Sequence, residues 1–324
     1  MIFSEQNEET IAALGESQLI EQIREWLGTA NPSAPFGIGD DCAVLQNPKQ
    51  NQILVTTDSL CLNRHFDRNT PPEKAGAKLI KRNLSDIAAM GGQPSSAVLA
   101  LLAGPNLSTQ WLQQFFDGIR ESCLQYEVSL VGGDVTQTEQ NHFSAVLTLT
   151  GQTQKPMLRS SAKLGHALFV TGTLGGSILG KHLEFSPRLE EGQWLAGQPD
   201  CTALMDLTDG LPKDLPQLLP DACCASLDLE QIPLSEAVRS LADQTGKSPL
   251  DHAFSDGEDY ELLFAVDEKD KPSDFIQRWQ ARFPELVIHR IGMIQPKQSE
   301  ARLIDTSSGE PIPYTQGYEH FAAS

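Results

Sequence analysis

Aspartates next to glycine or hydroxyl residues recur in five segments of the chain, each beside the expected end of a helix or strand. These aspartates are Asp40, Asp41, Asp58, Asp86, Asp134, Asp206 and Asp209. Mg²⁺ prefers hard oxygen ligands and keeps several waters, so carboxylates that converge from several elements can hold it while substrate phosphates complete its shell. The set therefore predicts a divalent-cation site of the kind that serves phosphate chemistry.

A second interpretation of each segment is a plain turn, because aspartate beside glycine is common turn chemistry. For any one segment the turn is at least as good an interpretation as the ligand. Five segments at the ends of different elements favour the site, although their spacing alone leaves the convergence open.

Two other patterns invite a functional interpretation and are better explained structurally. Residues 175–181 (GGSILGK) are one residue short of a phosphate-binding loop, and His182 stands where a Ser or Thr should contact Mg²⁺. We interpret this segment as a Gly-rich turn that packs a helix against a sheet. The adjacent pair Cys223-Cys224 is interpreted as partly buried strand positions.

The elements that must position the aspartates follow from hydrophobic periodicity. Helices are expected at residues 17–27, 73–90, 108–124, 175–184 and 234–243. Strands are expected at residues 53–57, 96–103, 128–131, 142–150, 167–171, 203–207, 224–229, 260–266 and 287–292. Because strands and helices mix without strict alternation and residues 151–165 turn polar, the sequence favours two α+β domains, 1–152 and 153–324.

Composition excludes several classes of partner. The 24 basic and 43 acidic residues give a net charge of −19, which repels nucleic acid. No apolar run approaches the ~20 residues of a membrane span, and the first 30 residues lack the pattern of a signal peptide. The six cysteines show no CxxC spacing, so a zinc site is not expected and the predicted compartment is the cytoplasm, with reduced thiols.

Nine motifs, taken together and in order, resemble the thiamine-monophosphate kinase family. They are FGIGDDCAVL (36–45), TTDSL (56–60), NRHF (63–66), NLSDIAAMGGQP (83–94), VGGDVTQT (131–138), TGTLGGS (171–177), DLTDGL (206–211), DGEDYELLF (256–264) and GYEHF (317–321). Each is weak alone, but the ordered set is specific and covers essentially the whole chain. The resemblance implies the aminoimidazole-ribonucleotide-synthetase-like fold, with an N-terminal α/β domain that binds ATP and dimerises through its sheet and a C-terminal α+β domain.

The resemblance also implies several Mg²⁺ ions, ATP as co-substrate and thiamine phosphate as acceptor. The implied metal ligands are Asp40, Asp41, Thr56, Thr57, Asp58, Asp86, Asp134, Asp206 and Asp209, with Asp58, Asp134 and Asp209 as catalytic candidates. The implied nucleotide contacts are Gly133, Asp134, Arg159 and Thr208. The implied thiamine-phosphate contacts are His65, Glu258 and Tyr318.

Elementary chemistry agrees with this reaction. The second pKa of a phosphate ester is about 6, so the acceptor is already mostly a dianion at neutral pH and needs no general base. Two unit charges 4 Å apart repel by about 1 kcal/mol in water and about 4 kcal/mol at an effective dielectric of 20, so cations must offset the repulsion of two polyanions. A carboxylate such as Glu258 and an aromatic face such as Tyr318 suit a thiazolium cation.

Alternatives stand beside these roles. Arg159 can be a solvated loop residue, Tyr318 a C-terminal packing residue and His65 a partly buried histidine. Two other functions are compatible with the pattern. One is another ATP-dependent synthetase of the same fold, and the other is a non-catalytic sensor of divalent ions or nucleotides.

Overall fold

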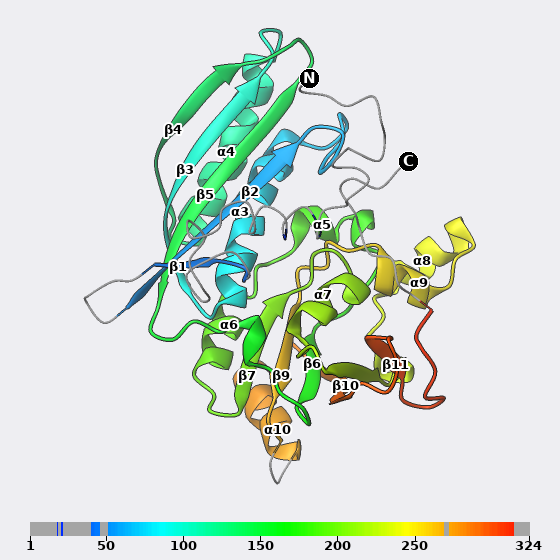
Figure 1. The fold of residues 1–324 in the computed structure, drawn as a ribbon. Helices are drawn as coiled ribbons and strands as arrows, with labels where there is room; N and C mark the ends of the chain where they lie inside the picture. The colour runs from blue at the N-terminus through cyan, green and yellow to red at the C-terminus, as the bar shows by residue number, and fades with distance from the viewer. Residues whose placement is uncertain (1–17, 19–20, 22–39, 46–50, 269–271, 314–324) are drawn as a thin grey trace.

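Two β-sheets, one from each half of the chain, organise the protein (Figure 1). The computed structural model describes residues 18, 21, 40–45, 51–268 and 272–313. The first sheet is five-stranded and ends at Thr153, and the second is six-stranded and begins at Ala167. The expected α+β class is therefore confirmed, while the division into 1–152 and 153–324 stays a prediction.

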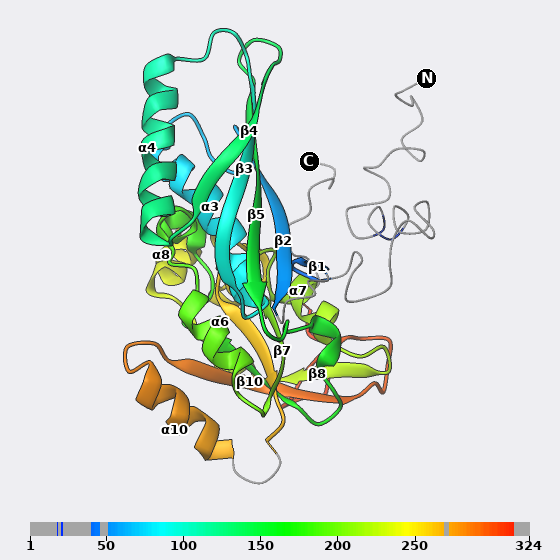
Figure 2. The same cartoon turned by 90° about the vertical axis from the view of Figure 1, so that its left-hand side faces the viewer.

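The N-terminal sheet has the strand order β1-β2-β5-β3-β4. Its strands are β1 (Ala43–Leu45), β2 (Gln52–Cys61), β3 (Gln93–Ala103), β4 (Ser129–Gln137) and β5 (Phe143–Thr153). Only the β3–β4 pair is parallel. Helices α3 (Pro72–Ala89) and α4 (Thr109–Gln125) cover one face of this sheet, and within the described residues no helix covers the other (Figure 2).

Local sequence explains both helices. Apolar residues at helical spacing, including Leu79, Leu84 and Ile87, form the fully buried face of α3, as its periodicity predicts. The Oγ atom of Ser108 accepts a hydrogen bond from the backbone N–H of Trp111 and so caps the first turn of α4. The expected helices at residues 73–90 and 108–124 are confirmed to within one residue at each end.

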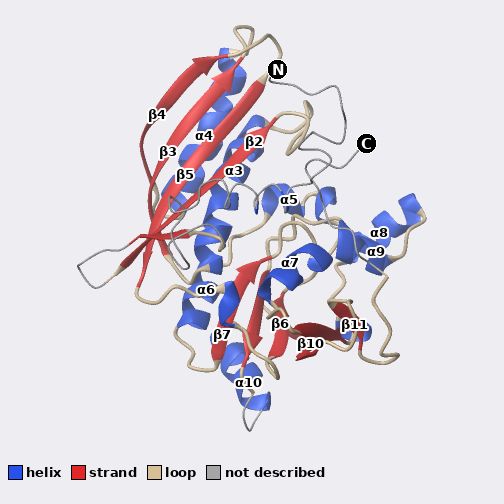
Figure 3. Ribbon diagram, in the orientation of Figure 1, coloured by secondary structure: helices blue, strands red, loops and turns tan. Residues whose placement is uncertain are grey.

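The C-terminal sheet has the order β11-β8-β10-β6-β9-β7 and is flanked by short helices (Figure 3). Its strands are β6 (Ala167–Thr171), β7 (Cys201–Asp206), β8 (Cys223–Leu227), β9 (Leu262–Val266), β10 (Ile288–Pro296) and β11 (Leu303–Asp305). The helices are α5 (Lys181–Glu184), α6 (Leu189–Ala196), α7 (Leu211–Leu218), α8 (Glu236–Thr245), α9 (Pro249–Ser255) and α10 (Pro272–Arg282). Every residue of β6, β8 and β9 is buried, so these strands form the centre of the core. No helix in the described part of the chain has both the length and the apolar content to cross a bilayer.

Some expectations about the elements are wrong. Strands β2 and β4 do not stop at the end of their apolar runs, because their backbone pairing with neighbouring strands continues through polar residues. Asp58 and Asp134 therefore lie inside strands and not at strand ends. The helix expected at 175–184 is a 3₁₀ turn at Ser177–Leu179 followed by the single-turn α5. Most of the helix expected at 17–27 lies outside the described residues.

Helix α3 is the element that the two halves share. It lies on the N-terminal sheet and also contacts α5, α6 and β7 of the C-terminal half. Helix α6 approaches it closely, because a Cβ atom added to Gly192 would lie 2.1 Å from the carbonyl oxygen of Ala88. The aspartate near the end of α3 is thereby held beside the C-terminal sheet.

Close packing of α3 against α4 also depends on glycine. A Cβ atom added to Gly118 would lie 1.9 Å from the backbone oxygen of Glu73, so Gly118→Ala must push the helices apart. We expect it to lower the free energy of unfolding by about 1–3 kcal/mol, the usual effect of overpacking. Urea unfolding measures this. Gly197→Ala is the control, because its added Cβ meets nothing closer than 3.4 Å. Equal stability of the two variants would contradict the packing argument.

Candidate active site

Three aspartates from distant parts of the chain meet between the two sheets. Asp41 precedes β1, Asp86 lies in the last turn of α3, and Asp206 is the last residue of β7. One carboxylate oxygen from each lies within 4.8 Å of the others. The predicted convergence of aspartates is therefore present for these three residues.

Burial and mutual repulsion make this cluster electrostatically unfavourable on its own. Burial, followed by the nearby charges of Asp58 and Asp41, raises the pKa of Asp86 well above its usual range. Burial, then Asp41 and Asp86, raises the pKa of Asp206 in the same way. Each carboxylate accepts one hydroxyl hydrogen bond, Asp86 from Thr56 and Asp206 from Ser85. These neutral donors leave the negative charge largely uncompensated.

Arg159 provides the cation that contacts the cluster directly. Its Nε and Nη2 atoms donate to the two carboxylate oxygens of Asp41 over 2.8 and 2.6 Å. Its backbone N–H donates to Asp40 over 2.8 Å, and its Nη1 donates to Gln217. Arg159 thus holds both members of the Asp40-Asp41 pair and is not a solvated loop residue.

The donor set fits Mg²⁺. It consists of carboxylate oxygens with a threonine hydroxyl beside them, and hard oxygen ligands are what this ion selects. A divalent cation would also remove the repulsion that raises the pKa of Asp86 and Asp206. Asp41, Asp86 and Asp206 are the residues that would hold it.

A cavity of about 520 Å³ opens beside the cluster. Residues from both halves of the chain line it: Asp58, Arg64, His65, Arg82, Asp86, Ile178, Thr208, Asp209, Leu241, His252, Asp256, Glu258 and Tyr260. Predicted metal ligands and two predicted thiamine-phosphate contacts therefore line one cavity. We call Asp58, Asp86 and Asp209 the metal end of this cavity, and His65 and Glu258 its acceptor end.

At the acceptor end, His65 and Glu258 are held in defined orientations. The backbone N–H of Cys61 donates to Nδ1 of His65 over 2.9 Å, so in the neutral ring the proton lies on Nε2. The hydroxyl of Tyr260 donates to Glu258 over 3.1 Å, and the Lys78 ammonium lies 2.7 Å from the same carboxylate oxygen. The acceptor end thus presents an imidazole of defined tautomer and one carboxylate.

Thr208 and Asp209 lie in the turn after β7, which a buried carboxylate shapes. One oxygen of Asp214 accepts the backbone N–H groups of Thr208 and Asp209 over 2.9 and 3.0 Å. Burial, and then the charge of Asp209, raises the pKa of Asp214 to about 7. Lys213 pairs with Asp209 over 2.9 Å. The turn is therefore fixed before any ligand arrives.

Three predicted residues lie apart from the cluster. The strand register places Thr57 and Asp134 in rows that face away from α3, whereas Asp58 lies on the α3 face. Gly133 is on the α3 face but in the edge strand β4, where an added Cβ would lie 1.9 Å from the oxygen of Leu99. Asp134 is exposed and accepts a hydrogen bond from Thr136. The remaining contact, Tyr318, lies outside the described residues.

Residues 175–181 and the Cys223-Cys224 pair have the structural roles that we expected. Gly175 donates its backbone N–H to Asp259, and Lys181 pairs with Glu261 over 2.8 Å. Lys181, the lysine of the 175–181 segment, therefore pairs with a protein carboxylate. Cys223 and Cys224 are both buried positions of β8.

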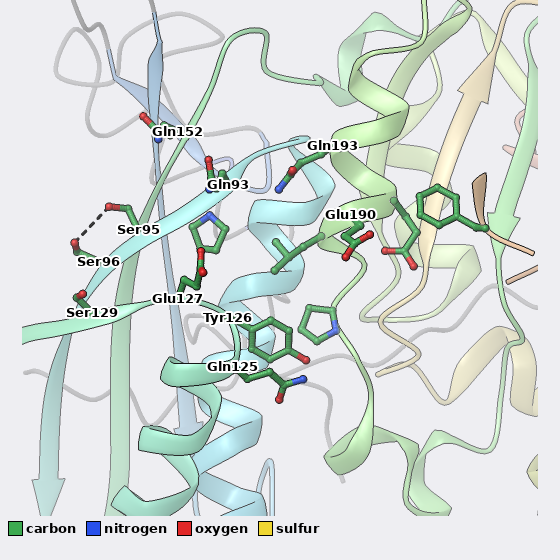
Figure 4. A pocket seen from close by; sticks show the side chains of 15 residues that line it. Gln93, Ser95, Ser96, Gln125, Tyr126, Glu127, Ser129, Gln152, Glu190 and Gln193 are labelled. Atoms are coloured by element: carbon green, nitrogen blue, oxygen red, sulfur yellow. Dashed lines mark hydrogen bonds between the residues drawn. The ribbon is translucent and has the colours of Figure 1, made fainter. Parts of the chain in front are cut away.

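A larger cavity, about 880 Å³, lies elsewhere between the start of β3, the end of α4 and α6 (Figure 4). Gln93, Gln125, Tyr126, Glu190 and Gln193 are among the side chains around it. Its lining contains no lysine, arginine or histidine. It therefore offers no side-chain cation for a phosphate, whereas Arg64 and Arg82 line the smaller cavity.

Comparison with known proteins decides the family. Residues 39–153 match the family described as AIR synthase related protein, N-terminal domain. Thiamine-monophosphate kinase from Rhodopirellula baltica is 35% identical over 298 residues, covering 89% of this chain and 92% of its own. The enzyme of that name from Haemophilus influenzae is 33% identical, covering 96% and 99%. The chain belongs to the thiamine-monophosphate kinase family.

Solved structures of the kinase family agree with this assignment. AaThiL complexed with AMPPCP and TMP superposes with a TM-score of 0.82 at 28% identity, covering 98% of this chain and 99% of that one. The hydrogenase maturation protein HypE in complex with ATP gives a TM-score of 0.64 at 17% identity, which shows the fold alone. The aminoimidazole-ribonucleotide-synthetase-like fold expected from the motifs is confirmed.

Sequence patterns did not single out several residues of this kinase's site. Lys78 and Arg82 lie one turn apart on helix α3, and both contact predicted site carboxylates. Asp214 supports the Thr208 turn, and Tyr260 supports Glu258. A charged residue on the otherwise apolar face of a predicted helix was the available signal for Lys78.

The acid cluster makes stability depend on pH and on Mg²⁺. In EDTA, Asp86 and Asp206 keep protons in the folded state at pH values where unfolded carboxyls, with a pKa of 3.8, have lost theirs. The free energy of unfolding should therefore fall as pH rises above about 4. Asp206→Asn should flatten this dependence, exceed the wild type in stability at pH 8 in EDTA, and lose most of the stabilisation by MgCl₂.

Urea unfolding at pH 5 and pH 8, with EDTA or MgCl₂, measures these changes. Asp243→Asn, at an exposed position of α8, is the matched control and should follow the wild type. An Asp206→Asn protein that Mg²⁺ still stabilises as strongly as the wild type would remove this residue from the metal site.

Proposed function

We propose that this protein transfers the terminal phosphoryl group of ATP to thiamine phosphate, giving thiamine diphosphate and ADP. The observation that carries the proposal is one cavity lined both by His65 and Glu258 and by Asp86, a member of the carboxylate cluster. Support comes from AaThiL, whose solved structure is described as complexed with AMPPCP and TMP. It also comes from thiamine-monophosphate kinases that align over most of their length.

The ends of the cavity divide the work between the substrates. The metal end and the neighbouring Asp41 and Asp206 would hold the Mg²⁺ ions, and the ATP phosphates bind there. When bound, Mg²⁺ ions supply the charge that offsets repulsion between the two polyanions and hold the reacting oxygens in line. Thr208 and Arg159 contact the nucleotide from the side of the C-terminal half.

The acceptor phosphate lies between the metal end and the acceptor end. As a dianion it attacks the terminal phosphorus directly, so the protein needs no general base. His65 donates its Nε2 proton to an oxygen of this phosphate, which fixes the direction of attack. Glu258 faces the thiazolium ring, where a carboxylate stabilises a cation.

Turnover tests the function. Incubation with Mg-ATP and thiamine phosphate should yield thiamine diphosphate and ADP in equal amounts, and EDTA should abolish the reaction. Asp58→Ala should lower kcat at least about 100-fold. The variant lacks a carboxylate that would hold Mg²⁺, and Mg²⁺ would stabilise the charge of the transition state. Asp243→Ala, on the exposed face of α8, should retain full activity.

Chromatographic detection of both products measures this turnover. Release of ADP without thiamine diphosphate would point to a different acceptor and another synthetase of this fold. Tight Mg-ATP binding with no ADP release for any acceptor would make the protein a sensor.

We propose that the protein is a homodimer through the N-terminal sheet. The face of this sheet opposite α3 carries Val98, which is 43% exposed, together with Ala100, Leu102 and Val146, which are only partly buried. No described helix covers these apolar residues. Thr57 and Asp134 lie on the same face, so a second copy packed there would enclose both predicted metal ligands.

Val98→Lys tests this arrangement. A charge in the covered centre of an interface is costly, so the variant should be monomeric in light scattering while the wild type is dimeric. Its turnover should fall as well, since Thr57 and Asp134 then face water. Val287→Lys is the control, because Val287 is 49% exposed in the C-terminal half. A dimeric Val98→Lys protein would place the interface elsewhere.

We also propose a cytoplasmic location and the domains 1–152 and 153–324. All six cysteines are free thiols, which suits a reducing compartment. The two sheets, which end at Thr153 and begin at Ala167, support a division close to the proposed one.

A further inference from the structure

We infer that Lys78 is a positioning residue that joins the two halves of the acceptor end and so sets the affinity for the phosphate acceptor. Lys78 lies on α3, and its side chain is 0% exposed. Its ammonium lies 2.7 Å from Oε1 of Glu258 and donates to the backbone oxygen of His65 over 2.9 Å. Lys78 therefore contacts both acceptor-end residues, Glu258 at its carboxylate and His65 at its backbone oxygen.

These two partners come from different halves of the chain. His65 follows β2 of the N-terminal sheet, and Glu258 follows α9 of the C-terminal half. The ring of His65 is oriented by the Cys61 N–H, which leaves its backbone oxygen for Lys78. A lysine with three donors can hold both partners at once. The distance between the His65 ring and the Glu258 carboxylate is thus fixed through one side chain.

The loop around Glu258 needs such an anchor. Glu258 has a backbone φ of +54°, and Tyr260 one of +51°, a region that side chains other than glycine rarely occupy. The N–H of Glu258 donates to the oxygen of Thr208 over 2.7 Å, which ties this loop to the turn after β7. Its side chain is 28% exposed toward the cavity. The Lys78 contact keeps this strained loop turned toward the acceptor.

Lys78 and Glu258 also stabilise each other's charge. Burial raises the pKa of Glu258, but the nearby cations, Lys78 first and then Arg82, together hold the pKa below its usual range. Burial lowers the pKa of Lys78, with Glu258 opposing the shift. Without Lys78, the carboxylate would be partly buried without its nearest cation and would turn away or take up a proton. Either change removes a negative charge from the place where the acceptor's cationic ring binds.

The metal end has a nearer cation than Lys78. One turn further along α3, Arg82 pairs with Asp58 over 3.2 Å and donates to the oxygen of Ser59 over 2.7 Å, whereas Lys78 acts on Asp58 only as a more distant charge. The direct contacts of the two cations on α3 therefore differ, Lys78 pairing with Glu258 and Arg82 with Asp58. Loss of Lys78 should change recognition of the acceptor and leave recognition of ATP unchanged.

This inference rests on the proposed function, and steady-state kinetics of Lys78→Met tests it. We expect KM for thiamine phosphate to rise on the order of tenfold, which corresponds to about 1.4 kcal/mol, with KM for ATP unchanged. Lys74→Met is the matched control. Lys74 lies one turn earlier on the same helix, and its ion pair with Glu184 is 45% and 61% exposed at the two side chains. It should behave as the wild type.

A double-mutant cycle identifies the partner. If Lys78 acts through Glu258, the effects of Lys78→Met and Glu258→Gln on this KM should be strongly non-additive. Additive effects, an unchanged KM for thiamine phosphate, or an equal rise in both KM values would overturn the inference. Should circular dichroism show that Lys78→Met is unfolded, Lys78→Gln takes its place, because it can still donate to the His65 oxygen.

The same cycle measured by urea unfolding separates this inference from the proposed function. It reports the coupling of residues 78 and 258 without any substrate. If the wild-type protein makes no thiamine diphosphate but residues 78 and 258 are coupled, the proposed function is rejected and the positioning role of Lys78 is supported. A productive wild type without coupling in either assay would reject the anchor and keep the function.

Discussion

Repulsion among buried carboxylates is the constraint on which the rest of this structure depends. Asp41, Asp86 and Asp206 bring their oxygens within 4.8 Å of one another in a place that water reaches poorly. No arrangement of neutral hydroxyls offsets three such charges, and Arg159 offsets only part of them. The three hydrophobic clusters found in the described residues supply the free energy that holds this unfavourable group together. A site of this kind trades stability for affinity toward cations, as functional sites often do.

Helix α3 positions the charged residues around this carboxylate cluster. Its apolar face is buried in the N-terminal core, which fixes the helix as a rigid support. It also carries Lys78, Arg82 and Asp86 at successive turns, where Lys78 contacts Glu258, Arg82 contacts Asp58, and Asp86 lies beside Asp41 and Asp206. Because α6 packs closely on the same helix, the C-terminal loops that carry Glu258 and Asp209 approach from a fixed direction. A side chain on this one helix, such as Lys78, can therefore contact residues from both halves of the chain.

The sequence predicted the chemistry of the site better than its local structure. Aspartates beside glycine and hydroxyl residues included the three that meet, Asp41, Asp86 and Asp206, but also Asp134, which lies on the other face of its sheet. Apolar periodicity located α3 and α4. The limits of β2 and β4 were wrong because hydrogen-bonded pairing between strands does not end where apolar residues end. Lys78 was missed because its role depends on Glu258, 180 positions away, and no local pattern reports such a distant partner. Short helices such as α7, which contains Pro216, also lack a clear periodic signal.

The hydrogen bond from Ser85 to Asp206 spans 121 positions of the chain, and this separation has a consequence for biosynthesis. While the ribosome is still making β6, the N-terminal sheet and α3 can already be folded, because domains fold as units during synthesis. At that stage Asp86 has Asp41 and Thr56 available but still lacks Asp206. The three-carboxylate cluster can therefore be completed only after β7 has been synthesised.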